Sequence, residues 1–155
     1  MEARGGSERY FMIDQLQKDQ AARADLFRFF GAIRPEKLDS WLRERKLDIP
    51  QDLKTFWCET GGGDLFESET VLSPFGNVDL GDDIDSVNQG RWQKGMPAHW
   101  LAFHTGLGLS VVETLSGGYA NLHGDSYEVR STFKSLDDWY SNFLRKEYAE
   151  RYGLR

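Results

Sequence analysis

Apolar residues recur at helical spacing in three stretches of the first sixty residues, and each stretch predicts a helix. Residues 8–30 contain neither Pro nor Gly and predict one long helix, or two abutting helices, ended by Gly31. Residues 35–47 begin with a proline, which suits the first turn of a helix, and carry an amphipathic stripe. Residues 50–60 begin in the same way. The glycines at 61–63 end this helix, because glycine adopts the left-handed closing conformation at little cost.

The pattern changes to strands and turns after the three glycines. Short apolar pairs predict strands at 65–66 and 71–72, and an acidic helical turn follows at 82–89. Ser135 is the expected cap of a terminal helix. Between these elements, Gly-containing turns separate four strand-like segments that predict an antiparallel meander, at 100–104, 109–115, 119–123 and 127–130. This order predicts a single α+β domain over residues 1–155, with an antiparallel or mixed sheet of about four to six strands covered by helices on one face.

The composition indicates a globular chain without a disulfide framework. Hydrophobic residues make up 39% of the 155 residues and aromatic residues 14%, whereas disordered chains are poor in both. The single cysteine, Cys58, excludes an intramolecular disulfide and a thiolate zinc site, and we interpret it as a small buried apolar residue. Neither an export signal nor an apolar run of the roughly 18 residues that cross a bilayer is visible. We therefore expect a cytoplasmic protein without a membrane partner.

Negative charge is concentrated in one part of the chain. The net charge is −6, which argues against a nucleic-acid or anionic-membrane partner, because both require a positive surface. No Lys or Arg lies between Thr55 and Gly90, a segment that we name the acidic window. Its eight acids are Glu59, Asp64, Glu67, Glu69, Asp79, Asp82, Asp83 and Asp85. The imbalance of charge therefore belongs to this window.

Two interpretations of the acidic window stay open. A solvated surface that keeps the protein soluble explains a run of like charges without any partner. A docking surface for a cationic protein also explains it, because complementary charge speeds association and selects the partner. Trp92, in a polar stretch, would then add an exposed aromatic contact of the kind that dominates interfaces. The candidate partner-binding residues are Asp64, Glu67, Glu69, Asp79, Asp82, Asp83, Asp85 and Trp92. Reversing Asp82, Asp83 and Asp85 to Lys is expected to slow association and to leave the fold intact.

The histidines offer a catalytic alternative to binding. His104 and His123 fall near the ends of predicted strands, and with Glu113 or Asp125 they would form the acid/base pair of a small hydrolase or a two-histidine metal site. The spacing of the three histidines does not match a zincin helix, and the glycine turns match neither a Walker loop nor a dinucleotide loop. The acids at 82–85 lack the Gly and Glu of a calcium loop. We therefore assign no catalytic, cofactor-binding or metal-binding residue.

Two segments are similar to motifs of one family. Residues 49–57 read IPQDLKTFW and run to the glycine turn GGGD at 61–64, and residues 132–139 read TFKSLDDW at the start of the terminal helix. Both segments resemble the SUKH superfamily, the Smi/Knr-like domain of bacterial immunity proteins and fungal cell-wall regulators. The resemblance lies in residues 35–155 and leaves residues 1–34 as an N-terminal helical region. It implies an α+β fold with helices flanking a mixed or antiparallel sheet.

The resemblance implies binding rather than catalysis. Many bacterial members of this superfamily are immunity proteins that neutralise a cognate polymorphic toxin, often a nuclease encoded by a neighbouring gene, in bacterial competition. The expected partner is therefore a toxin domain with a basic surface, whose active site the protein occludes. A regulatory or scaffold module without a toxin partner is the alternative that stays open. Partner surfaces vary between members, so no interface residue is carried over.

Overall fold

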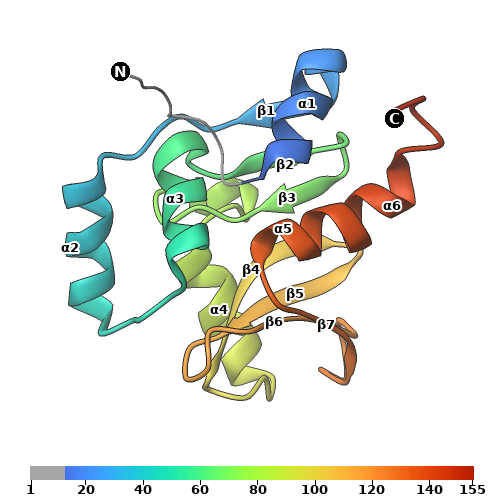
Figure 1. Ribbon diagram of the computed structural model, residues 1–155. Coiled ribbons are helices and arrows are strands. Elements are labelled where there is room, and N and C mark those ends of the chain that lie inside the picture. The colour runs from blue at the N-terminus through green and yellow to red at the C-terminus, as the bar shows by residue number, and fades with distance from the viewer. Residues whose placement is uncertain (1–12) are drawn as a thin grey trace.

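An antiparallel sheet of seven strands forms the centre of the protein (Figure 1). The structure is a computed structural model that describes residues 13–155. The strands lie side by side in sequence order, and every neighbouring pair is antiparallel. They are β1 (Phe27–Phe29), β2 (Gly63–Leu65), β3 (Glu69–Val71), β4 (Trp100–Gly106), β5 (Gly108–Glu113), β6 (Tyr119–Leu122) and β7 (Val129–Phe133). The predicted α+β class and the meander of the last four strands are confirmed. The short strands predicted at 65–66 and 71–72 correspond to β2 and β3, each displaced toward the N-terminus, and β1 is the seventh strand beyond the four to six expected.

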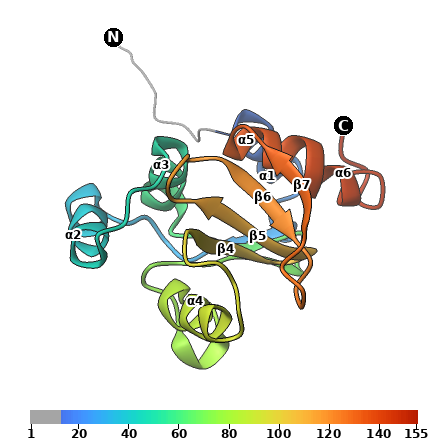
Figure 2. The same ribbon diagram turned by 90° about the horizontal axis from the view of Figure 1, so that it is seen from below.

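Helices precede, interrupt and follow the sheet. They are α1 (Asp14–Ala22), α2 (Pro35–Arg45), α3 (Gln51–Thr60), α4 (Ile84–Gln93), α5 (Leu136–Trp139) and α6 (Arg145–Tyr148), with the 3₁₀ turns η2 (Ala24–Leu26) and η3 (Val78–Leu80). A π-helical turn, η4 (Tyr140–Leu144), joins α5 to α6 in one C-terminal helical segment. Figure 2 shows α4 on one face of the sheet and α3 and the C-terminal helical segment on the opposite face. The expectation of helices on a single face is therefore wrong, because α4 covers the second.

Both faces of the central strands are buried. The larger hydrophobic cluster packs α2, α3 and the C-terminal helical segment against the sheet and includes Val112 of β5. The smaller cluster contains Val111 of the same strand, and Trp92 of α4 packs against it. Successive residues of a strand point to opposite faces, so β5 contributes to both clusters. This explains why β5 reads as an apolar run, the pattern of a strand that is covered on both sides.

The N-terminal stretch differs from the helix predicted over residues 8–30. Helix α1 ends at Ala22, and Phe27–Phe29 form the edge strand β1, whose backbone pairs with β2. In β1 the side chain of Phe27 is buried and that of Arg28 is exposed, which is the alternation of a strand. The partner strand follows only after α2 and α3, so a non-local contact decides the conformation here. The part of the predicted helix before residue 13 lies outside the described residues.

The two segments that carry the family resemblance meet in the structure. Asp52, in the first turn of α3, accepts a hydrogen bond at Oδ2 from the backbone N–H of Leu136 (2.8 Å) and one at Oδ1 from the hydroxyl of Tyr119 (2.5 Å). Gly61 ends α3 with φ 78°, as predicted. A Cβ atom at Gly61 would lie 2.0 Å from the carbonyl oxygen of Gly31. The glycine turn is therefore packed tightly against the chain at the end of β1.

Candidate functional site

The acidic window does not form one surface. Two of its acids, Glu69 and Asp83, are buried. The others of the predicted site lie on β2, in the turn after it, in the connection from β3 to α4, and on α4 itself. Only those acids of the predicted site whose side chains reach solvent can contact a partner.

Glu69 points from β3 into the interior, where its side chain is only 3% exposed. Its Oε1 accepts hydrogen bonds from Nε2 of His104 and from the backbone N–H of Leu107, both at 2.8 Å. Its Oε2 accepts one from the hydroxyl of Tyr148, at 2.6 Å. The carboxylate thus joins β3 to β4 and to α6. Glu69 stabilises the fold and does not face a partner, which corrects its place among the predicted contacts.

A chain of hydrogen bonds continues from Glu69 and fixes the protonation of His104. Oγ of Ser110 accepts hydrogen bonds from Nε1 of Trp139 (2.9 Å) and Nδ2 of Asn121 (3.1 Å), two groups that only donate. Both lone pairs of the hydroxyl are then used, so its O–H donates to Nδ1 of His104, at 2.8 Å. His104 is therefore neutral, with its proton on Nε2. Burial lowers the pKa of His104 below the ordinary 6.5 and outweighs the opposing attraction of Glu69.

Ser110, His104 and Glu69 are connected in the order of a hydrolase triad, but their surroundings differ from those of a catalytic site. A nucleophilic serine needs a hydroxyl that a substrate can approach. Ser110 and His104 are 0% exposed, and Nε1 of Trp139 donates a hydrogen bond to the serine oxygen. Burial alone would raise the pKa of Glu69, but the hydrogen bonds that the carboxylate accepts lower it. The three residues form a satisfied polar network inside the core.

The other histidines do not join this network. His123 is exposed, and its Nδ1 accepts a hydrogen bond from the backbone N–H of Asp125 at 3.1 Å. His99 lies at the surface, with Nε2 3.3 Å from Oε2 of Glu113. The structure thus does not bring His104 and His123 to one cleft, as the hydrolase alternative requires. Within residues 13–155, no group of three or more His, Cys, Asp or Glu side chains is placed to hold a metal ion.

Asp83 and Asp85 have structural roles at the start of α4. Asp83 is the N-cap, and its carboxylate accepts hydrogen bonds from the backbone N–H of Ser86 (2.9 Å) and from its hydroxyl. Asp85 accepts two hydrogen bonds from Arg45 at the end of α2, at 2.8 Å from Nε and 2.6 Å from Nη2. Reversing Asp82, Asp83 and Asp85 to Lys would therefore remove a helix cap and an interhelical ion pair. The variant is therefore expected to lose stability as well as charge, so it does not isolate the effect of charge on association.

The remaining acids of the predicted site face solvent at two neighbouring places. On β2, Asp64 is half-buried and accepts a hydrogen bond from Thr70, at 3.0 Å, and Glu67 in the following turn is exposed. Residues 74–82, which we name the acidic loop, contain the exposed Asp79 and the half-buried Asp82. Partial burial raises the pKa of Asp82, and the charges of Asp64 and Asp83 raise it further. The two places therefore share one negative field.

The acidic loop also exposes two large apolar side chains that the sequence patterns do not reveal. Leu80 is 71% exposed and Phe75 is 42% exposed. Nζ of Lys37 lies 4.3 Å from the centre of the Phe75 ring, so this side chain is partly covered by α2. Leu80 lies among Gly, Asp and Asn residues, where no periodicity marks a buried or exposed face. The loop thus combines acidic and apolar contacts.

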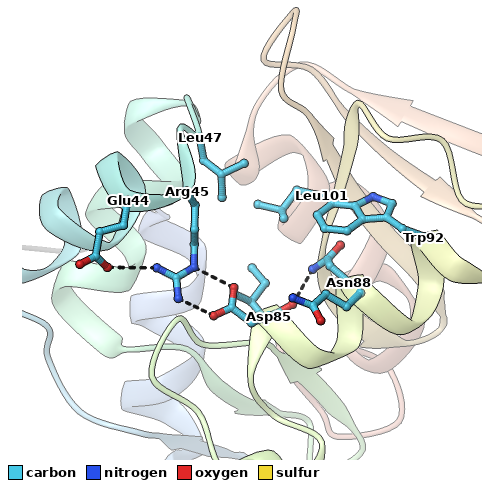
Figure 3. Close-up of a pocket in the computed structure, with 9 residues that line it drawn as sticks. Glu44, Arg45, Leu47, Asp85, Asn88, Trp92 and Leu101 are labelled. Atoms are coloured by element: carbon cyan, nitrogen blue, oxygen red, sulfur yellow. Dashed lines mark hydrogen bonds and ion pairs between the residues drawn. The ribbon is translucent and has the colours of Figure 1, made fainter.

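A cleft of about 480 Å³ opens between α2 and α4 and contains the last two candidate residues, Asp85 and Trp92 (Figure 3). We name it the α2–α4 cleft. Nε1 of Trp92 donates a hydrogen bond to the carbonyl of Trp100, at 3.0 Å, and the ring is half-buried. Trp92 is therefore a wall of this cleft and not a freely exposed aromatic side chain. Glu44 and Arg45, on α2, complete the polar rim and lie outside the acidic window.

Comparison with known proteins adds no relative. No model of a known protein family matches the chain, and no curated protein matches it. The similarity to the SUKH superfamily therefore stays a prediction that rests on the two short segments. In the part of the chain that the structure describes, no helix is both long and apolar enough to cross a membrane.

Proposed function

We propose that this protein is a non-enzymatic immunity protein that acts in the cytoplasm, where it binds a cognate bacterial toxin domain and occludes its active site. The resemblance of residues 35–155 to the SUKH superfamily supports this function. A toxin domain with a basic cleft, such as a nuclease, is the partner that an acidic protein surface suits, because carboxylates take the place of phosphate groups. The proposal assigns the protein a binding role and gives it no catalytic residue.

The observation that carries the proposal is the composition of the acidic loop. Asp79 and Asp82 flank a leucine, Leu80, that is 71% exposed. A surface that serves solubility alone does not need an exposed leucine, whereas interfaces combine apolar contacts with a polar rim. Asp82 also experiences repulsion from Asp64, which raises its pKa in addition to the effect of burial. A cation of the partner at this place would relieve that repulsion.

Co-expression with the toxin domain encoded by the neighbouring gene tests the immunity role. We expect protection of the host cell and a complex that survives gel filtration. Unchanged killing together with no complex would refute the role, and it is the result that a regulatory or scaffold module without a toxin partner gives.

The electrostatic part is tested with the double variant Asp79→Lys and Asp82→Lys. The association rate constant for the toxin domain should fall about tenfold at low salt and less at high salt, because screening weakens steering. The matched control reverses Asp125 and Glu128, two exposed acids in the turn between β6 and β7. An association rate that the double variant leaves unchanged at both salt concentrations would contradict the electrostatic part.

A further inference from the structure

The α2–α4 cleft joins an apolar floor to an acidic rim. Leu47, Ile84 and Leu101 line it, and all three belong to the larger hydrophobic cluster or pack against it. The cleft therefore opens directly onto the core. Glu44, whose side chain is 74% exposed, and Asp85 place carboxylates at the rim (Figure 3). The volume of about 480 Å³ lies within the usual range of binding pockets.

The walls of the cleft are held by hydrogen bonds and stacking. Arg45 donates two hydrogen bonds to Asp85 across the cleft, one to the backbone carbonyl of Trp41 at 3.1 Å, and its Cζ lies 4.3 Å from the centre of the Trp41 ring. On α4, Nδ2 of Asn88 donates to the carbonyl of Ala102 at 2.9 Å, and its Oδ1 accepts from the N–H of the same residue at 2.6 Å. These contacts fix α2 and α4 in place, so a ligand would meet a preformed site and would lose little affinity to ordering it.

The charges around the cleft favour a cationic occupant. Two carboxylates at the rim, from Glu44 and Asp85, face one guanidinium, from Arg45, so a negative charge remains. Helix α4 begins two residues after Asp82, so the acidic loop leads directly into the helix that forms one wall of the cleft. The ring of Trp92 on the wall offers the apolar contact that recurs in binding hot spots. Charge and shape together select an apolar side chain that is flanked by cations.

We propose that the α2–α4 cleft receives an aromatic or branched aliphatic side chain from a basic segment of the protein partner, and that Lys or Arg residues beside it contact Glu44 and Asp85. This inference rests on the proposed function, because it names the segment of the partner that would anchor in the site. The acidic loop and the cleft then form one interface, in which the loop attracts the partner and the cleft holds it.

The test uses the ¹⁵N-labelled full chain and three synthetic peptides. The probe is the blocked pentapeptide Gly-Lys-Phe-Lys-Gly, and its controls replace the phenylalanine by alanine or both lysines by glutamate. We expect the probe to shift the indole N–H resonance of Trp92 and the amide resonances of α4, and to bind at least tenfold more tightly than either control. Equal binding of the alanine peptide, no binding of the probe, or shifts confined to other parts of the chain would overturn the proposal.

Matched variants locate the binding. Gln89→Trp fills the mouth of the cleft from an exposed position and should weaken binding of the probe at least tenfold, whereas Gln93→Trp changes an exposed glutamine outside the cleft on the same helix and should not. Glu44→Lys should weaken binding several-fold, whereas Asp39→Lys makes the same charge change elsewhere on α2 and should not. Circular dichroism checks that each variant is folded. Equal affinities of Gln89→Trp and Gln93→Trp would overturn the proposal.

Two further results separate this inference from the proposed function. If the chain binds the probe in the cleft but forms no complex with the toxin domain, the proposed function fails and the chemistry of the cleft stands. If the toxin domain is bound equally well by Gln89→Trp and by the unmodified chain, the inference about the cleft fails and the proposed function stands. Shifts of the cleft resonances that depend on protein concentration without any peptide would assign the cleft to a second copy of this chain and overturn the proposal.

Discussion

The neutral state of His104 makes the stability of the fold depend on pH. In the folded protein, burial lowers the pKa of this imidazole, so the ring stays neutral to a lower pH than it does in the unfolded chain. In the unfolded chain it takes up a proton below a pH of about 6.5. The unfolded state then binds more protons than the folded state, so the free energy of unfolding falls as the pH falls. For one such site the loss between pH 7 and 5.5 reaches about 1.3 kcal/mol when the folded ring stays neutral over the whole range.

The loss is measured by urea unfolding, followed by tryptophan fluorescence, at pH values between 7.0 and 5.5. The variant His104→Gln keeps an N–H that can donate to Glu69 but has no titrating ring. Its free energy of unfolding should therefore fall less than that of the natural chain over this range, by up to about 1.3 kcal/mol. Long-range ¹H–¹⁵N spectra of the natural chain should show the proton of His104 on Nε2 at every pH. Equal pH dependence in the two proteins, or protonation of the His104 ring above pH 5.5, would establish a charged pair with Glu69 and refute the neutral assignment.

Three other substitutions test contacts that hold the fold, each by urea unfolding. Glu69→Ala leaves three donors without an acceptor and should cost about 3–5 kcal/mol, whereas Glu69→Gln keeps one acceptor oxygen for His104 and Leu107 and should cost about 1–2 kcal/mol; equal losses would contradict the role of the carboxylate oxygens. Asp52→Ala removes the acceptor that joins α3 to α5 and should cost about 2–3 kcal/mol, so a loss below about 0.5 kcal/mol would show that this link is unimportant. Gly61→Ala places a Cβ atom 2.0 Å from the carbonyl oxygen of Gly31 at a residue with positive φ, so it should lower the free energy of unfolding by at least about 3 kcal/mol. The control Gly124→Ala has no atom within 4 Å of its Cβ and should leave the stability almost unchanged. Similar losses at the two glycines would contradict the close packing of the turn.

Local signals in the sequence predict the capped ends of helices after residue 34, whereas Gly31 does not end a helix as predicted. Ser135 caps α5 by accepting a hydrogen bond from the backbone N–H of Asp138 at 3.0 Å, and Asp83 caps α4, both as their residue types indicate. The meander of β4 to β7 is equally local, because each strand pairs with the next along the chain. Such contacts lie within a short stretch of sequence, where spacing and turn residues report them directly.

Contacts between distant segments are harder to predict. Glu69 lies two residues before the buried Val71, so strand alternation places both on the inner face. A carboxylate is stable there only because His104, from β4, and other distant donors surround it, and no local pattern shows those donors. The α2–α4 cleft depends in the same way on Arg45 and Asp85, which are 40 residues apart. The sequence indicates an acidic segment but does not say which of its acids reach solvent.

Only some acids of the acidic window reach solvent, and this limits how its charge can act on a partner. Burial of Glu69 and Asp83 takes two of the eight acids out of direct contact with a partner, and Asp85 is paired with Arg45 at the rim of the cleft. The acids left on the acidic loop are few and solvated, and at physiological salt their field decays over about 8 Å. They therefore influence the rate and orientation of the encounter, whereas the lifetime of a complex depends on apolar anchoring in the α2–α4 cleft. Charge reversal on the acidic loop should therefore change the association rate constant. Filling the α2–α4 cleft with Gln89→Trp should instead change the dissociation rate constant, so the two effects can be measured separately.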